Sequence, residues 1–425
     1  MKNKIIHILA HSPSNGRGPA YESGPKDENP TLGSTNPGDY EHYQRIEHYP
    51  YWIGFFQNDW HVKVARETLK VTDEYEVECW RPYLGIDKIH SKDVNGIIHR
   101  LFPSRRIRIG RYNLGERSPL IVNEIKKVIK NSKVILHLHG THSTNINYIL
   151  RKVNLKRIPV VAQHHGGSSY HHQYKIKKNP LLLLLHLVLK EKRLLKQVDS
   201  FFALNRLEKN DLEELGCKNV KIQTMGVNFD FFRPINKKSC RDELGLPLDK
   251  KVILFIGRFN KEKGFYFLMK AAMKLLKTRD DFIVVNVGGL KNKDNAKYWN
   301  NKNIMMFNRV SKNELLNFYN ASDTLVLPSL NEGFGLVIIE AMACNTPVIA
   351  SSVGGILDIK EKINTLKLVS PQNVDEMIVA IKEYLRKPPL VKSREKAIHF
   401  YSWQKIIKDT IKIYRILEEK YEFRN

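Results

Sequence analysis

Short apolar runs alternate with segments of helical periodicity along most of the 425-residue chain. Apolar runs of this kind, bounded by polar or glycine-containing turns, are typical of parallel strands that are buried on both faces. The pattern predicts strands at residues 4–10, 75–80, 134–139, 159–164, 200–204, 251–256, 282–287, 304–307, 324–327 and 347–350. It predicts helices at residues 59–71, 265–276, 312–321, 336–343, 373–386 and 402–422. This alternation indicates an α/β fold with parallel sheets covered on both faces.

The chain is long enough for two domains, each with its own core. The segment GVNFDFFRP (residues 226–234) ends in a proline that cannot pair in a strand, so we expect the interdomain linker at about 228–240. We predict an N-terminal domain over residues 1–228, completed by a C-terminal helix over 402–425, and a second domain over 229–401. Residues 13–50 are rich in Gly, Pro, Ser and Asn and predict a long irregular loop.

Composition favours a globular protein of a reducing compartment. Hydrophobic residues make up 42 % and charged residues 27 % of the chain, and no apolar run approaches the ~20 residues of a membrane span. The N-terminus lacks the pattern of a signal peptide. The four cysteines are scattered without a CxxC pair, which predicts free thiols. We therefore expect a cytoplasmic protein.

The formal net charge is +26, which predicts attraction to polyanions or phosphorylated substrates. Basic residues are concentrated at 91–130, where Arg105, Arg106, Arg108 and Arg111 are nearly contiguous. The chain lacks a helix-turn-helix, zinc or RNP-like signature, so we do not expect nucleic-acid binding. Residues 175–196 have basic ends around a leucine-rich centre and predict either a helix at an anionic membrane surface or an ordinary buried helix.

The segment NEGFGLVIIE (residues 331–340) is the most informative part of the chain. A glycine-rich turn that opens a helix presents backbone N–H groups to an anion. Glu332 and Glu340 flank this turn and can accept hydrogen bonds from hydroxyl groups. A phosphate with hydroxyls on either side is what a nucleotide-sugar offers.

Three other strand ends in the second half carry matching features. Arg258 and Lys263 follow the strand at 251–256 and can clamp two phosphates. Gly288-Gly289 permits close approach of a ligand, and the main chain of Asn308-Arg309-Val310 could read the edge of a base. Ligands of open parallel sheets bind beyond the carboxyl ends of the strands. We therefore expect these segments to meet in one site.

The second half resembles the donor-binding domain of retaining glycosyltransferases of family 4, which have the GT-B fold. The matching motifs are Gly257-Arg258, Lys263-Gly264, the segment 332–343 and Gly354-Gly355. The resemblance covers about residues 226–403, and more weakly 130–226. It implies two Rossmann-like domains whose parallel sheets face each other across a cleft. Asn345 stands where many relatives carry glycine.

The resemblance also implies roles for single residues. Arg258 and Lys263 would bind the donor diphosphate, and Glu332 the hydroxyls of the transferred sugar. The N–H groups of the turn would bind sugar and phosphate, and Glu340 the ribose. We accordingly expect catalytic roles for His165, Glu332, Arg258 and Lys263, and donor binding by Arg258, Lys263, Gly333, Phe334, Gly335, Leu336, Glu340, Arg309 and Val310.

Histidines gather in the first half, at His137, His139, His164 and His165. An HxH pair can ligate zinc, but no carboxylate lies beside these pairs in the sequence and there is no HExxH. We therefore expect no metal. Relatives carry a histidine in this domain that touches the transferred sugar, and His165 matches it best, with His139 second.

These observations predict a retaining, metal-independent hexosyltransferase that uses a UDP- or GDP-sugar and no other cofactor. The expected acceptor is a glycan or lipid-linked molecule in cell-surface polysaccharide or glycolipid synthesis, with possible contact to the inner membrane face. A sugar-nucleotide-binding protein without turnover and a basic nucleic-acid-binding protein are the alternatives.

Overall fold

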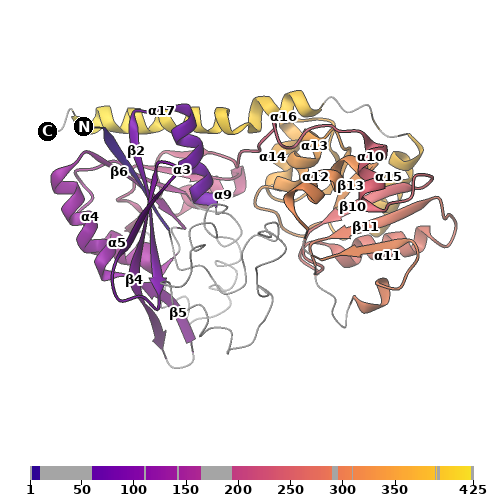
Figure 1. The fold of residues 1–425 in the computed structure, drawn as a ribbon, viewed down its shortest axis with the longest axis horizontal. Helices are drawn as coiled ribbons and strands as arrows, with labels where there is room; N and C mark the ends of the chain where they lie inside the picture. The colour runs from indigo at the N-terminus through magenta and orange to yellow at the C-terminus, as the bar shows by residue number, and fades with distance from the viewer. Residues whose placement is uncertain are drawn as a thin grey trace. The chain divides into compact units, whose positions relative to one another are not determined.

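A computed structural model describes residues 2–9, 60–109, 112–140, 143–163, 194–289, 295–308, 310–387, 389 and 393–422. The chain divides into two compact units. The described residues up to 223 and from 407 form unit 1, and those from 224 to 406 form unit 2. The observed boundary at 223/224 lies five residues before the boundary at 228/229 that we predicted from the sequence. Figure 1 shows the elements of both units.

Unit 1 is built on a sheet with the strand order β3-β4-β2-β1-β6-β7-β8-β9, and β5 pairs with β4. Its strands are β1 (Asn3–Ile8), β2 (Tyr75–Leu84), β3 (His90–Val94), β4 (Ile97–Ile109), β5 (Tyr112–Arg117), β6 (Val134–His139), β7 (Val160–Gln163), β8 (Ser200–Ala203) and β9 (Val220–Ile222). Among the described strands of this sheet, only the β3–β4 and β4–β5 pairs are antiparallel. The sequence pattern did not predict β3, β4 or β5, because strands at the margin of a sheet lack the continuous apolar run of a central strand.

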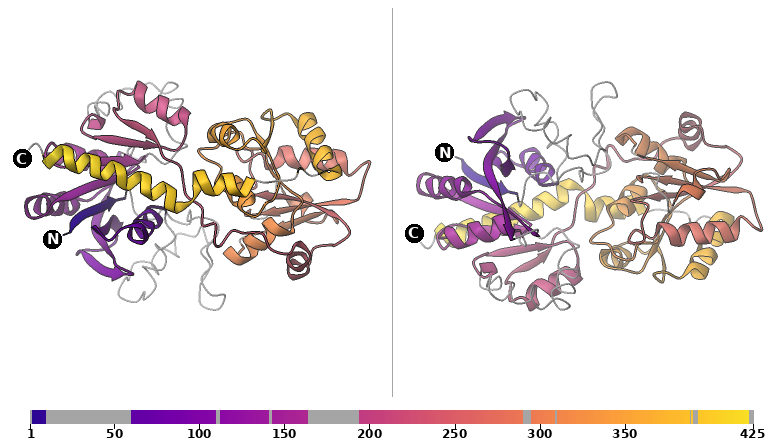
Figure 2. Two further views of the ribbon diagram at one scale, coloured as in Figure 1. Left: turned by 90° about the horizontal axis from the view of Figure 1, so that it is seen from above. Right: turned by 90° about the horizontal axis from the view of Figure 1, so that it is seen from below.

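The helices of unit 1 are α3 (Trp60–Val71), α4 (Pro119–Asn131), α5 (Thr144–Lys152), α9 (Arg206–Glu214) and α17 (Trp403–Glu422). From Ile407 onward, α17 packs on the unit 1 sheet and buries one apolar side chain per turn: Ile407, Ile411, Tyr414, Leu417 and Tyr421. Tyr75 Oη donates a hydrogen bond to Glu418 at 2.8 Å, and Lys420 pairs with Asp199. The views of Figure 2 both show α17 lying along this sheet.

Unit 2 has a six-stranded, fully parallel sheet in the order β12-β11-β10-β13-β14-β15. Its strands are β10 (Lys251–Ile256), β11 (Phe282–Val287), β12 (Ile304–Phe307), β13 (Thr324–Leu327), β14 (Val348–Ser351) and β15 (Lys367–Val369). The order reverses between β10 and β13. The predicted parallel α/β architecture is therefore confirmed.

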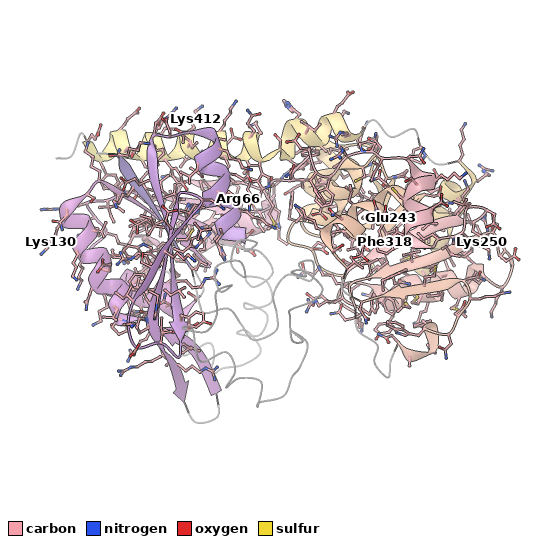
Figure 3. All side chains as sticks on the ribbon, viewed as in Figure 1. Arg66, Lys130, Glu243, Lys250, Phe318 and Lys412 are labelled. Atoms are coloured by element: carbon pink, nitrogen blue, oxygen red, sulfur yellow. The ribbon has the colours of Figure 1, made fainter. Side chains whose placement is uncertain are left out.

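The helices of unit 2 are α10 (Lys237–Leu244), α11 (Phe265–Leu275), α12 (Lys312–Ala321), α13 (Leu336–Ala343), α14 (Gly355–Lys362), α15 (Val374–Arg386) and α16 (Ser393–Tyr401), with a 3₁₀ turn η2 (Ala296–Tyr298). Helix α10 begins inside the stretch that we predicted as linker, at 228–240, because Asn236 caps it by accepting a hydrogen bond from Ser239 N. Figure 3 shows the side chains, with Phe318 in the interior of unit 2 and Lys130 and Lys412 on the surface of unit 1.

No helix in the described ranges combines the length and the apolar character needed to cross a bilayer. The predicted loop at 13–50 lies outside the described residues, and so does nearly all of the stretch at 175–196.

Candidate functional site

The loop after β10 brings the predicted cations to the carboxyl end of the unit 2 sheet. Asn260 Oδ1 accepts a hydrogen bond from Lys263 N at 2.9 Å, which holds the loop in shape. A Cβ atom on Gly264 would lie 1.8 Å from the carbonyl oxygen of Pro328, just after β13. Only glycine therefore allows the loop to approach the end of β13 so closely.

The glycine pair after β11 lies against the same loop. A Cβ atom on Gly288 would be 3.4 Å from the carbonyl oxygen of Gly257, and Gly288 N bonds to Phe307 O at 3.1 Å at the end of β12. Val310 follows β12 and is buried, whereas Arg309 lies outside the described residues. The ends of β10, β11 and β12 therefore meet.

Lys263 and Glu332 form an ion pair at the centre of this region. Lys263 Nζ lies 2.7 Å from Glu332 Oε1, although the residues are 69 positions apart. Ser329, which is fully buried, donates from Oγ to the same oxygen at 3.0 Å. The side chains of Lys263 and Glu332 are 25 % and 11 % exposed, so the pair is largely shielded from water.

The turn between Glu332 and α13 is held by the start of α14. Gly355 N donates to Glu332 O at 3.1 Å, and a Cβ atom on Gly354 would lie 2.0 Å from that same oxygen. Gly335 is the N-cap of α13 with φ +86°, and no side chain caps the helix there. The first N–H groups of α13 are therefore not covered by a capping side chain, which is the arrangement that binds anions.

Glu340 lies on α13, and a tyrosine of α12 holds its carboxylate. Tyr319 Oη donates to Glu340 Oε2 at 2.6 Å, and the Tyr319 side chain is fully buried. Buried Cys344 is close by, and burial, with the Glu340 charge second, raises the pKa of its thiol to about 12. Tyr319 and Ser329 could not be predicted from the sequence, because contacts between α12, β13 and α13 depend on packing that no spacing rule reveals.

Arg258 is more loosely held than Lys263. Its side chain is 63 % exposed, and its Nη2 lies 3.5 Å from Oε2 of Glu262, four residues further along the same loop. An exposed pair of this kind contributes little to stability, so the guanidinium can turn toward a ligand.

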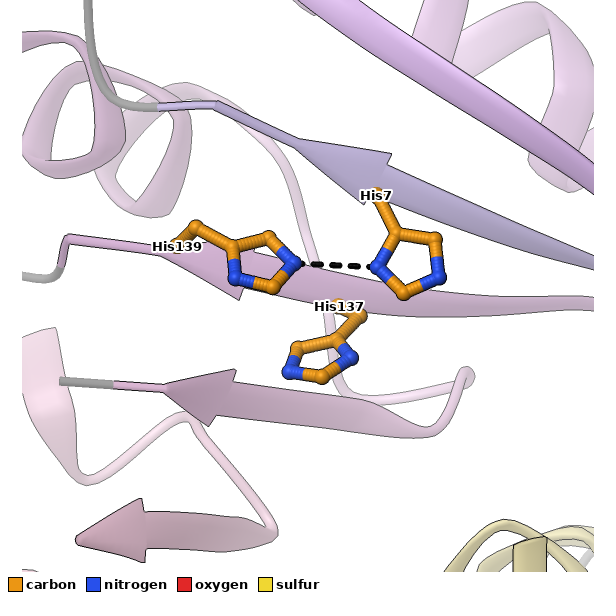
Figure 4. A group of neighbouring side chains, drawn as sticks. All are labelled: His7, His137 and His139. Atoms are coloured by element: carbon orange, nitrogen blue, oxygen red, sulfur yellow. Dashed lines mark hydrogen bonds between the residues drawn. The ribbon is translucent and has the colours of Figure 1, made fainter. Parts of the chain in front are cut away.

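A cluster of histidines occupies the unit 1 sheet at the carboxyl ends of β1 and β6. His7 and His137 are aligned in the parallel register, and His139 follows on the same face. All three are buried. Figure 4 shows His7 Nδ1 and His139 Nε2 joined by a hydrogen bond of 2.9 Å, with His137 beside them. His137 Nδ1 lies 2.7 Å from Tyr414 Oη on α17. His165, the preferred sugar contact, lies outside the described residues.

This cluster is the one group of three potential metal ligands among the described residues, with its ligand atoms within 4.8 Å of one another. Tetrahedral zinc sets two histidine nitrogens about 3.3 Å apart, with Zn–N bonds of about 2.0–2.1 Å. The 2.9 Å contact between His7 and His139 is shorter and fits a shared proton. The sequence did not point to His7, because its position opposite His137 depends on strand register.

Comparison with solved structures gives full-length matches at low identity. Sucrose-phosphate synthase from Thermosynechococcus elongatus has a TM-score of 0.68 and 19 % identity, over 98 % of this chain and all of that chain. Anabaena HepE in complex with UDP and glucose has a TM-score of 0.60 and 15 % identity, over 96 % of this chain and 99 % of that one. These likenesses establish the fold.

Sequence relatives match over a shorter range. A glycosyltransferase of Methanocaldococcus jannaschii is 31 % identical over 218 residues, which are 47 % of this chain and 55 % of that protein. D-inositol 3-phosphate glycosyltransferase 2 of Catenulispora acidiphila is 34 % identical over 183 residues, 39 % of this chain and 43 % of that protein. The chain thus spans about half the length of the curated relatives it matches.

The family model described as "Glycosyl transferases group 1" matches residues 236–399. This range contains the loop with Arg258 and Lys263, the Glu332 turn, and Tyr319 with Glu340. The chain therefore has the GT-B fold, and its residues 236–399 match the model of the glycosyl transferases group 1.

Proposed function

We propose that the protein transfers a hexose from a UDP- or GDP-sugar to a glycan or lipid-linked acceptor, with retention of the anomeric configuration and without a metal. The observation that carries this proposal is the Lys263–Glu332 pair, 2.7 Å apart beside a helix start without a side-chain cap. A cation and backbone N–H groups suit the diphosphate, and the adjacent carboxylate suits the hydroxyls of the attached sugar.

The leaving group of such a reaction is a nucleoside diphosphate, whose negative charge grows as the sugar departs. Lys263 and the first N–H groups of α13 would stabilise that charge, because fixed donors need little reorganisation during the reaction. Arg258, whose side chain is exposed, would turn toward the same charge. Glu340, held by Tyr319, would bind the ribose hydroxyls and fix the nucleotide. We further propose that the acceptor hydroxyl attacks on the face that the diphosphate leaves.

The solved neighbours guide the choice of donor to test first. HepE was solved in complexes with UDP and with UDP-glucose, so we propose a UDP-sugar ahead of a GDP-sugar. We also propose that the reaction takes place in the cytoplasm, at the inner membrane face when the acceptor is lipid-linked. Synthesis of cell-surface glycans is the pathway we expect.

The first experiment screens UDP- and GDP-sugars for a rise in the thermal unfolding midpoint of the full chain. A ligand that binds only the folded state at 100 times its Kd adds about 2.7 kcal/mol of stability. We expect one donor to stabilise the wild type, and the Lys263→Ala and Glu332→Ala variants to lose sugar transfer while remaining folded. Lys274→Ala is the matched control, because Lys274 pairs with Asp375 on the surface of unit 2.

Three results would contradict the proposal. They are near-wild-type transfer by either site variant, loss of transfer on removal of divalent metal with EDTA, and donor binding without sugar transfer to any acceptor fraction. The last would favour the non-catalytic alternative.

A further inference from the structure

The hairpin of β4 and β5 extends beyond the carboxyl end of the unit 1 sheet. Residues 97–104 of β4 pair with β2, whereas residues from Arg105 onward pair only with β5. Figure 1 shows this arm at the end of β4. Small ligands of α/β folds bind beyond the carboxyl ends of the strands, so the base of the arm lies at the edge where a ligand is expected.

Two arginines face each other directly across this hairpin. Arg105 is the register partner of Arg117, and directly opposed side chains have Cβ atoms about 4.5–5.5 Å apart. Both residues are exposed, and neither forms an ion pair with a described acidic residue. Like charges placed directly opposite destabilise a strand pair, so this arrangement carries a cost that an anion between the two guanidinium groups would remove.

The nearest acidic side chain of the hairpin points to the other face. Glu116 is the register partner of Arg106 and accepts a hydrogen bond from Ser104 Oγ at 2.6 Å. Successive side chains of a strand alternate between faces, so Glu116 shares its face with Arg106 and Ser104. The face with Arg105 and Arg117 therefore has no carboxylate from the described part of the hairpin.

Packing against α5 holds the second arginine in place. The Arg117 guanidinium lies 5.5 Å from the centre of the Tyr148 ring, a distance at which a cation is attracted to an aromatic face. A Cβ atom on Gly115 would come within 2.6 Å of Thr144 Oγ1, at the first residue of α5. The glycine thus allows β5 to lie directly against this helix.

We propose that Arg105 and Arg117 bind a phosphate group carried by the acceptor, so that the enzyme acts on a phosphorylated acceptor. Two guanidinium groups on one face suit the separate oxygens of a phosphate. The identification of the phosphate carrier as an acceptor rests on the proposed function. The binding of a phosphate by Arg105 and Arg117 does not depend on it. Of the two acceptor types proposed above, we commit to the soluble one, a glycan that carries a phosphate group.

The test uses inorganic phosphate and glycerol 3-phosphate as probes on the full chain. Arg105→Gln and Arg117→Gln should each weaken phosphate binding about tenfold, the loss of one charge-assisted contact. Arg106→Gln is the matched control, one residue along the strand on the opposite face, and should leave phosphate binding unchanged. Repeating each titration in a Lys263→Ala background removes the proposed donor site, so that failure of the two proposals can be told apart.

Thermal unfolding gives a second readout, because the difference in midpoint between Arg105→Gln and the wild type should change sign when phosphate is added. Without phosphate, Arg105→Gln should raise the midpoint, because a like-charge pair is relieved. With saturating phosphate, the same variant should unfold below the wild type, which alone gains the bound anion.

The proposal is overturned if Arg105→Gln and Arg117→Gln bind phosphate as tightly as the wild type, or if Arg106→Gln loses as much affinity as they do. It is also overturned if neither soluble probe binds at this face while phosphatidylglycerol vesicles do, since that result would assign the arm to a membrane surface.

Discussion

Single hydroxyl groups orient both acidic side chains of the NEGFGLVIIE segment. Ser329 donates to Glu332 at 3.0 Å and Tyr319 donates to Glu340 at 2.6 Å, and both donors are buried. A hydrogen bond to a charged group contributes about 1.5–3 kcal/mol. The donors therefore fix the carboxylates before any ligand arrives, which reduces the ordering needed on binding.

Removing the Tyr319 hydroxyl should weaken recognition of the ribose. We expect Tyr319→Phe to bind UDP about tenfold more weakly, and to lose most of the preference for UDP over 2′-deoxy-UDP. Isothermal titration with the two nucleotides measures both effects. Tyr384→Phe is the matched control, since Tyr384 is buried in α15 away from Glu340. An unchanged preference in Tyr319→Phe would show that Glu340 does not need this hydrogen bond.

At the scale of elements, the candidate donor site depends on glycines that let loops touch. Gly264 approaches Pro328, and Gly354 approaches Glu332. The same logic explains Asn345, which follows α13 with φ +58°. Asparagine tolerates this left-handed conformation better than most residues, so the helix can end there without a glycine.

Substitution of Gly354 tests whether this close approach matters. Gly354 has φ +48°, and an added Cβ would lie 2.0 Å from Glu332 O, so we expect Gly354→Ala to destabilise unit 2 and to abolish nucleotide binding. Gly245→Ala is the matched control, because Gly245 has φ +64° with open space around it. The control should cost only the backbone strain of about 1–3 kcal/mol. Urea unfolding and UDP titration compare the two, and equal effects would argue against the contact.

Central elements of both sheets could be predicted from the sequence, because apolar runs and helical periodicity report burial directly. Strand β10, for example, covers the predicted range 251–256. The contact between Lys263 and Glu332 could also be predicted, because both residues follow carboxyl ends of neighbouring parallel strands. The β4–β5 hairpin was missed, because alternating arginine and isoleucine at 105–109 reads as a charged surface until a partner strand is known.

At the scale of the whole molecule, stability in acid should be limited by buried histidines in unit 1. Burial lowers the pKa of His7 to about 3 and that of His99 to about 4, for His99 with help from Arg81. The groups facing His7 are His137 and His139, which carry no negative charge to hold a proton there.

The sign of the pH dependence follows from these lowered pKa values. Below pH 6.5, the pKa of His7 in the unfolded chain, the unfolded chain binds a proton at His7 that the folded protein does not bind. Stability from His7 is therefore complete above pH 6.5 and falls between pH 6.5 and 3, by about 1.4 kcal/mol per pH unit. Urea unfolding followed between pH 7.5 and 5 measures the loss, and His99→Gln should reduce its slope. A flat profile over that range would mean that these histidines already carry protons in the folded protein.

The ion pair of Lys263 and Glu332 has one more consequence for a chain of net charge +26. While the pair is intact, its two charges cancel, so the pair adds no net positive charge to the candidate donor site. A simple anion that recruits the lysine leaves a shielded carboxylate behind, which is costly. A sugar diphosphate would offer hydroxyls to that carboxylate in exchange, so we expect the pair to favour the complete donor over simple phosphates.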